Sequence, residues 1–294
     1  MKKQEIIEED SIYKLLEKTR NVSRAEVSKL LDRARALKGL SMEEVAVLMN
    51  CNDREMVQKL HETARFVKDT IYGRRLVLFA PLYVSNLCEN ECLYCAFRAR
   101  NKDILRRSLT QEEIAEETRI LIEQGHKRVL LVSGEAYPRE GFDYILRSVD
   151  TVYNTKSGPG EIRRVNVNVA PLSLDEFKRL KQAEIGTYQI FQETYHLDTY
   201  HNVHVAGKKR DYNWRITALD RAMEAGIDDV GIGVLFGLYD WKFEILALFQ
   251  HIRYLENTFG VGPHTISVPR LEPASGSDIA AAPPYEVDDE AFKK

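Results

Sequence analysis

The sequence has no apolar run long enough to cross a membrane, which needs about 20 consecutive apolar residues. Its first residues, MKKQEIIEED, also lack the apolar core of a secretory leader. The formal net charge is only −3, because 45 acidic residues offset 42 basic ones, so nothing attracts the chain generally to nucleic acid or to an anionic membrane. We therefore expect a cytoplasmic protein with no membrane and no nucleic-acid partner.

Cysteine is also scarce, with four residues in 294. Three of them, Cys88, Cys92 and Cys95, follow the spacing Cys-x3-Cys-x2-Cys, whereas Cys51 stands alone and is interpreted as a small buried apolar residue. A disulfide is rare in the cytoplasm and would leave an odd thiol. Structural zinc usually needs four ligands, and His61, the nearest upstream histidine, lies in a separate helical segment. The spacing therefore favours an iron–sulfur cluster, and three thiolates would leave one iron open to a small molecule.

The rest of the chain predicts a helical region followed by an α/β scaffold. Residues 1–73 carry apolar residues at three- and four-residue spacing, with capping-box starts at Ser23 and Ser41. After Gly73, β-rich runs alternate with helical patterns, which predicts a parallel sheet with right-handed crossovers. These six runs are 76–85, 128–134, 164–170, 187–193, 229–237 and 264–271.

No dinucleotide fingerprint follows the first strand, so the pattern favours a TIM-type (β/α) barrel over a Rossmann sheet. The chain stops at EVDDEAFKK, which predicts the first turn of another helix, and an eight-stranded barrel would need two more strands. We therefore expect an N-terminal helical region over 1–73, a barrel domain over 74–294, and an incomplete barrel in the residues given.

Chemistry on a parallel barrel takes place where the strands end, and polar residues gather at those points. Glu135 follows the second strand, Asn168 ends the third, and Gln192, Glu193 and His196 belong to FQETYH at the fourth. Structural interpretations of the candidate residues also stay open. Glu135 could be an exposed carboxylate at a turn, Arg215 could form a surface salt bridge, and the glycines of the fifth predicted strand could only assist packing.

The cysteine motif, with the aromatic Tyr94 before its last cysteine, resembles the radical S-adenosylmethionine (SAM) enzymes. The resemblance implies a [4Fe–4S] cluster on Cys88, Cys92 and Cys95, whose open iron chelates SAM. Ser133-Gly134-Glu135 resembles the "GGE" motif that holds the SAM amino group, with Ser133 departing from the first glycine. The implied SAM-binding set is Tyr94, Ser133, Gly134, Glu135, Asn168, Gln192, Glu193, Arg215, Gly231 and Gly233.

Longer stretches resemble one family of radical SAM enzymes, the tyrosine lyases of [FeFe]-hydrogenase maturation. They include VSNLCENECLYCAFRARNK, DYNWRITALDRAMEAGIDDVGIGVLFGLYDW and HTISVPRLEPASGS. The resemblance implies cleavage of the Cα–Cβ bond of L-tyrosine to p-cresol and dehydroglycine. The implied partners are tyrosine, a reducing electron donor and other hydrogenase maturation proteins.

Two alternatives stay open at this point: the related tyrosine lyase of the thiazole pathway, and an iron–sulfur carrier without catalysis. The hydrogenase-type lyases also make CO and cyanide at a second cluster in a C-terminal domain. No cysteine follows Cys95, so we expect only the radical half of that chemistry in the residues given.

The sixth predicted strand supplies the candidate tyrosine-binding residues His264, Ser267 and Arg270. An arginine fork suits the substrate carboxylate, Ser267 could reach its amine or carboxylate, and His264 could orient the substrate. By strand alternation, His264 and Arg270 should share a face opposite Ser267.

Overall fold

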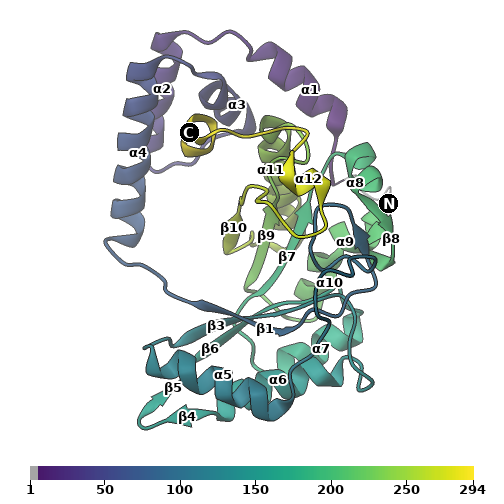
Figure 1. Cartoon of the computed structure of the whole chain (residues 1–294). Helices are drawn as coiled ribbons and strands as arrows, with labels where there is room; N and C mark the ends of the chain where they lie inside the picture. Colours follow the sequence, from purple (N-terminus) through teal and green to yellow (C-terminus); the bar gives the residue numbers. More distant parts are fainter. Residues whose placement is uncertain (1–5) are drawn as a thin grey trace.

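The computed structural model describes residues 6–294 and contains an open sheet of six parallel strands (Figure 1). The order β1-β3-β6-β7-β9-β10 follows the chain, so each strand lies beside the preceding one, as in a barrel wall. This confirms the predicted parallel (β/α) arrangement. The strands are β1 (Ala80–Ser85), β3 (Arg128–Ser133), β6 (Arg164–Asn168), β7 (Tyr188–Glu193), β9 (Val230–Val234) and β10 (Thr265–Ser267).

The first and last strands are shorter than the sequence predicts. The segment from Leu76 to Phe79 forms no strand, and its four apolar side chains are 49–81% exposed. β10 keeps only three of its eight predicted residues. Both strands are edges of the sheet, where a strand has a neighbour on one side only.

Helices cover the outer face of the sheet (Figure 1). Tyr188, Ile190 and Ile232 point to this face and belong to the main apolar core, where Phe177 of α7 contacts Tyr188 edge-on. The helical segment before β9 is broken at Thr217 into α9 and α10. The covering helices are α5 (Gln111–Glu123), α6 (Asp143–Asn154), α7 (Leu174–Gln182), α9 (Tyr212–Ile216), α10 (Ala218–Glu224) and α11 (Trp241–Phe259).

The opposite, inner face carries the alternate residues of each strand. The register pairs Tyr83 with Val132, Val132 with Asn168, Gln189 with Gly231, and Gly231 with Thr265. Val167 lies beside Tyr188, so Asn168 lies next to Gln189 one residue further on. These residues form one row across the inner face.

The N-terminal helices pack on the sheet domain through α1 and α3. Ile7, Ile12, Ala46 and Met49 join the main core, and the Tyr13 hydroxyl lies 2.8 Å from that of Tyr239. The four helices are α1 (Glu9–Lys18), α2 (Arg24–Arg35), α3 (Met42–Asn50) and α4 (Arg54–Tyr72).

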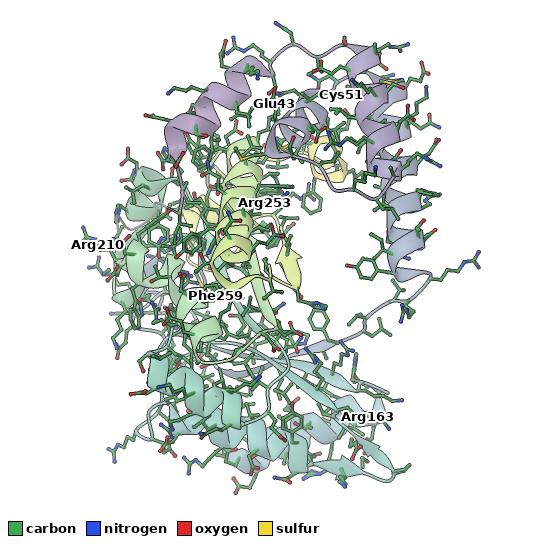
Figure 2. All side chains as sticks on the ribbon, turned by 180° about the vertical axis from the view of Figure 1, so that it is seen from behind. Glu43, Cys51, Arg163, Arg210, Arg253 and Phe259 are labelled. Carbon is green, nitrogen blue, oxygen red and sulfur yellow. The ribbon has the colours of Figure 1, made fainter. Side chains whose placement is uncertain are left out.

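Helices α2 and α4 have a small separate core with part of α3. Its members are Val27, Leu31, Val47, Cys51 and Met56. Cys51 is 2% exposed there, among the N-terminal helices, which confirms its interpretation as a buried apolar residue (Figure 2). Ser41 and Glu44 form the predicted capping box, whereas Ser23 accepts the Glu26 N–H without the reciprocal bond.

Short elements complete the described chain. The ribbon β2–β8 joins the cysteine segment to the region after α8, and the C-terminus ends in the predicted helical turn, α13. Within residues 6–294, no helix combines the length and apolar character that a membrane crossing requires. The remaining elements are β2 (Glu91–Cys92), β4 (Lys156–Ser157), β5 (Gly160–Glu161), α8 (Leu197–Val203), β8 (His204–Ala206), η1 (Lys208–Arg210), α12 (Asp278–Ala281) and α13 (Asp289–Lys293).

Candidate SAM and iron–sulfur site

The three clustered cysteines lie in the loop that follows β1, at the C-terminal edge of the sheet, and all are free thiols. Arg106 holds this cluster loop (residues 86–107) by donating to the backbone carbonyls of Asn86, Phe97, Arg98 and Asn101. Four carbonyls on one guanidinium fix the loop before any ligand binds.

A buried set of two carboxylates and two cations lies beside the cluster loop. Arg215 donates to Glu135 at 2.7 Å and lies 3.5 Å from Glu193, which accepts from Lys209 at 2.7 Å. Asn90 connects this quartet to the loop, because its amide donates to Glu135 at 2.7 Å and its oxygen accepts the Lys209 backbone N–H at 2.9 Å. The structure therefore brings together the predicted residues Glu135, Glu193 and Arg215.

The charges in this quartet stabilise one another. Burial alone would raise the pKa of Glu135, but Arg215 and Lys209 outweigh burial and lower it. Burial would likewise lower the pKa of Lys209, yet Glu193 and other negative groups raise it overall. Glu135 and Lys209 are therefore both ionised at neutral pH.

Burial raises the pKa of the Cys92 thiol to about 12, partly offset by Lys209. Cys95 shifts the same way for the same reasons. A buried thiol such as Cys92 or Cys95 loses its proton readily only when a cation, such as a metal ion, binds the sulfur.

Tyr94 is held by a neutral histidine. The Nδ1 of His204 lies 2.8 Å from the Tyr200 carbonyl, which can only accept, so Nδ1 carries the proton. The other ring nitrogen therefore accepts from the Tyr94 hydroxyl at 2.7 Å. Burial lowers the pKa of His204 to about 2, which keeps it neutral.

The predicted glycines are explained by close contacts. A Cβ on Gly134 would lie 2.2 Å from the Leu87 carbonyl oxygen, so Gly134 lets β3 end directly against the cluster loop. A Cβ on Gly231 would lie 2.8 Å from Gln189, and one on Gly233 would lie 2.8 Å from Phe191. The strand glycines thus make room for side chains of β7 on the inner face.

Ser133 and Gln192, two further predicted SAM residues, and His196, of the predicted polar cluster after the fourth strand, lie at the same edge. Ser133 is 7% exposed and donates to the Gly134 carbonyl. The Gln192 amide nitrogen is buried without a partner among the described residues, so it is available to a ligand. His196 caps α8 and stacks on Tyr239 with ring centroids 3.8 Å apart, which is a structural role.

The three candidate tyrosine-binding residues are not brought together. His264 precedes β10 at the opposite end of that strand and is exposed. Ser267 is at its C-terminal end and shares the inner face with Thr265. Arg270 follows the strand, donating to Asp289 at 2.8 Å and to the Val287 carbonyl, with its guanidinium over Phe292.

Sequence reasoning missed Asn90, Lys209 and His204. Asn90 lies inside the cysteine motif. What distinguishes it is its burial, since it is polar and only 1% exposed, and the sequence does not show burial. Lys209, in AGKKRDYNW, is indistinguishable in sequence from its neighbours Lys208 and Arg210, which are exposed.

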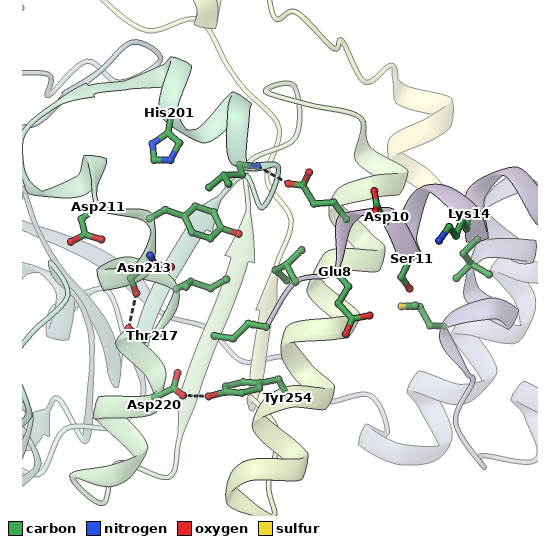
Figure 3. Close-up of a pocket in the computed structure, with 18 of the residues that line it drawn as sticks. Glu8, Asp10, Ser11, Lys14, His201, Asp211, Asn213, Thr217, Asp220 and Tyr254 are labelled. Atoms are coloured by element: carbon green, nitrogen blue, oxygen red, sulfur yellow. Dashed lines mark hydrogen bonds between the residues drawn. The ribbon is translucent and has the colours of Figure 1, made fainter. Parts of the chain in front are cut away.

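A large open hollow of about 1690 Å³ lies elsewhere, between α1 and the helices α9 to α11 (Figure 3). Its lining includes Glu8, Asp10, Lys14, Asp220 and Tyr254, and none of the predicted site residues. The residues predicted to hold the cluster and SAM therefore lie outside this hollow.

The residues present fit a cluster and SAM. In the part of the chain that the structure describes, no three Cys, His, Asp or Glu side chains converge as the ligands of a single metal ion would. Three thiols around a fixed loop instead suit a cluster whose ligands bind different irons. Beside them, the orphaned Gln192 amide and the close approach at Gly134 provide polar and backbone contacts for a ligand.

A model of the radical SAM superfamily matches residues 82–249. The chain belongs to this superfamily. Its members use a [4Fe–4S] cluster and SAM, and Cys88, Cys92 and Cys95 occupy the expected loop.

Individual proteins are similar over most of the chain. A solved structure of HydG, a maturase of the [FeFe]-hydrogenase, is 48% identical with a TM-score of 0.94, covering 98% of this chain and 63% of that one. HydG from Carboxydothermus hydrogenoformans is 42% identical with a TM-score of 0.86, covering 97% and 67%. The 2-iminoacetate synthase of Escherichia coli strain K12 is 32% identical over 84% of this chain and 64% of that protein. The chain thus spans about two thirds of the length of these relatives.

Proposed function

We propose that this radical SAM protein is a tyrosine lyase of the HydG type, which cleaves the Cα–Cβ bond of L-tyrosine to p-cresol and dehydroglycine. The observation that carries the proposal is the 48% identity to HydG over 98% of the chain, with the cluster loop and the charged quartet at one sheet edge. Tyrosine, a reducing electron donor and other maturation proteins are the proposed partners.

The bound cluster and SAM would supply a carbon-centred radical that removes a hydrogen atom from the substrate amine. The protein's own residues position the reactants. Cys88, Cys92 and Cys95 would hold the cluster, Glu135 would accept from the SAM amino group, and Glu193 and Arg215 would contact its sugar and carboxylate. Tyr94, fixed by His204, lies in the same loop as the ligating cysteines.

Lyases of the thiazole pathway remain a second candidate, because 2-iminoacetate synthase of Escherichia coli is 32% identical to this chain. Dehydroglycine is the same compound as 2-iminoacetate, so both candidates share the cleavage step. CO and cyanide release distinguishes them, since that step belongs to the hydrogenase-type lyases.

The proposal is tested by anaerobic cluster reconstitution and an assay for 5′-deoxyadenosine and p-cresol with tyrosine. Each single alanine variant of Cys88, Cys92 and Cys95 should lose the four-iron absorption and SAM cleavage, whereas Cys51→Ala, in the separate helical core, should retain both. If another substrate accelerates 5′-deoxyadenosine formation and p-cresol never appears, the lyase assignment is wrong and only the superfamily assignment survives.

A further inference from the structure

The side-chain amide of Gln189 lies on the inner face of the sheet. Gln189, in β7, is 8% exposed, and its side-chain amide has no hydrogen-bond partner among residues 6–294. Its amide atoms are not among the side-chain atoms that are both sealed from solvent and unpaired, so a ligand on the inner face can reach them. An amide on a residue this little exposed is normally paired with protein, water or a ligand.

The backbone is arranged to admit this amide. Its Cγ and nitrogen lie where a side chain on Gly231 would be, 2.8 Å and 3.3 Å from an ideal Cβ on that glycine. Any other residue at position 231 would displace Gln189. The same ideal Cβ is 3.4 Å from the Cβ of Thr265, so the amide lies over Gly231 toward β10.

The neighbours of Gln189 in the inner row are also polar and unpaired. Asn168 lies beside it on β6, and neither the Asn168 amide nor the Thr265 hydroxyl has a partner in the described chain. Phe191, two residues along β7, covers Gly233 and provides an apolar surface on the same face. Tyr83 ends the row 55% exposed, so the inner face is accessible from solvent.

The position of the row relative to the quartet suits an aromatic substrate. Glu193 ends β7 four residues beyond Gln189, about 13 Å along the strand. A tyrosine whose amine lies at the sheet edge would direct its ring down the inner face past Phe191. Its hydroxyl would then be the polar group directed toward the amides.

We propose that the side-chain amide of Gln189, admitted by Gly231 and flanked by Asn168 and Thr265, binds the phenolic hydroxyl of L-tyrosine and sets the preference for tyrosine over phenylalanine. The inference rests on the proposed lyase function. A site built to bond a hydroxyl rejects the analogue that lacks it, because its own polar groups are then left unpaired.

The experiment measures dissociation constants of tyrosine and phenylalanine by titration calorimetry on the reconstituted protein with SAM. Wild-type protein should bind tyrosine more tightly than phenylalanine. Gln189→Met, which keeps the side-chain length without the amide, should weaken tyrosine binding about five- to hundredfold and bring the two constants close together. Gln182→Leu, an exposed glutamine at the end of α7, is the matched control and should keep the wild-type ratio.

Gly231→Ala is a second, independent variant that displaces the amide without removing it, and it should lower the same ratio. If both Gln189→Met and Gly231→Ala keep the wild-type ratio of the tyrosine and phenylalanine dissociation constants and still form p-cresol, this inference is overturned. The proposed lyase function is then unaffected. A wild-type protein that neither binds tyrosine nor forms p-cresol overturns both.

Discussion

At the scale of single residues, the site depends on a charge balance that is complete before any cofactor binds. Lys209 and Arg215 face Glu135 and Glu193, with side chains only 5–15% exposed. Removing one member leaves a buried charge unpaired, which is far more costly than losing an exposed ion pair. Lys209 is therefore as necessary to this arrangement as the residues that the motif identifies.

Lys209→Met should lower the free energy of unfolding of the cofactor-free protein by about 3–5 kcal/mol. The double variant Lys209→Met/Glu193→Gln should recover part of that loss, because it removes both charges. Lys178→Met is the control, since its pair with Asp175 is exposed and should contribute at most about 1 kcal/mol. Urea unfolding measures all three, and equal effects of the two lysine variants would contradict the role of burial.

At the scale of elements, α11 holds the turn that follows β7. Glu244 of α11 is fully buried and accepts from the Thr194 hydroxyl and, at 2.9 Å, from the Tyr195 N–H. His251, two turns along the helix, lies 2.8 Å from the Tyr195 hydroxyl. Glu193 directly precedes this turn with a φ of 72°, an uncommon value for a non-glycine residue. A helix on the outer face therefore sets the backbone of a site residue.

Glu244 should make stability depend on pH. Burial raises the pKa of Glu244 from 4.5 to about 8, and the negative charges of Asp240 and Glu9 add to the shift. The native state therefore keeps a proton that the unfolded state has released, so the free energy of unfolding should fall as pH rises from 4.5 to 8. Gln at this position cannot ionise, so Glu244→Gln should remove this part of the slope.

Urea unfolding at pH 5, 7 and 9 measures this dependence in wild type and Glu244→Gln. Glu256→Gln, at the exposed pair with Arg253 on the same helix, is the control and should keep the wild-type slope. Identical slopes in wild type and Glu244→Gln would show that Glu244 does not ionise in this range.

At the scale of the whole molecule, the N-terminal helices divide between two cores. α1 and α3 contribute Ile12, Ala46 and Met49 to the main core, while α2 and α4 pack around Met56 and Cys51. The predicted boundary at residue 73 therefore does not separate two independent cores. Part of the N-terminal region belongs energetically to the sheet domain.

Ile12→Ala should lower the stability of the sheet domain by about 2–5 kcal/mol, because Ile12 is completely buried in the main core. The only two tryptophans, Trp214 and Trp241, lie in the sheet domain, so their fluorescence reports its unfolding. Met56→Ala, in the other core, should shift the helical circular-dichroism signal more than the fluorescence midpoint. Equal fluorescence shifts in the two variants would show that the cores unfold as one.

Much of the fold and part of the site could be predicted from local patterns. Alternating β-rich and helical runs predict parallel strands at nearly the observed places, because side-chain periodicity records which face is buried. The spacing of Cys88, Cys92 and Cys95 predicts the cluster, because ligands close in sequence depend little on the rest of the fold. The ends of β1 and β10 were predicted less well, since an edge strand has only one neighbour to extend it.

The sequence by itself determined the strand order, the helical N-terminus and the cysteine loop, all of which depend on residues near one another in the chain. Only the tertiary structure decided that Lys209 completes the charged quartet, that Arg270 pairs with Asp289, and that Gln189 lies over Gly231. These contacts join segments far apart in sequence or on neighbouring strands. Their geometry follows from register and packing, which no local pattern encodes.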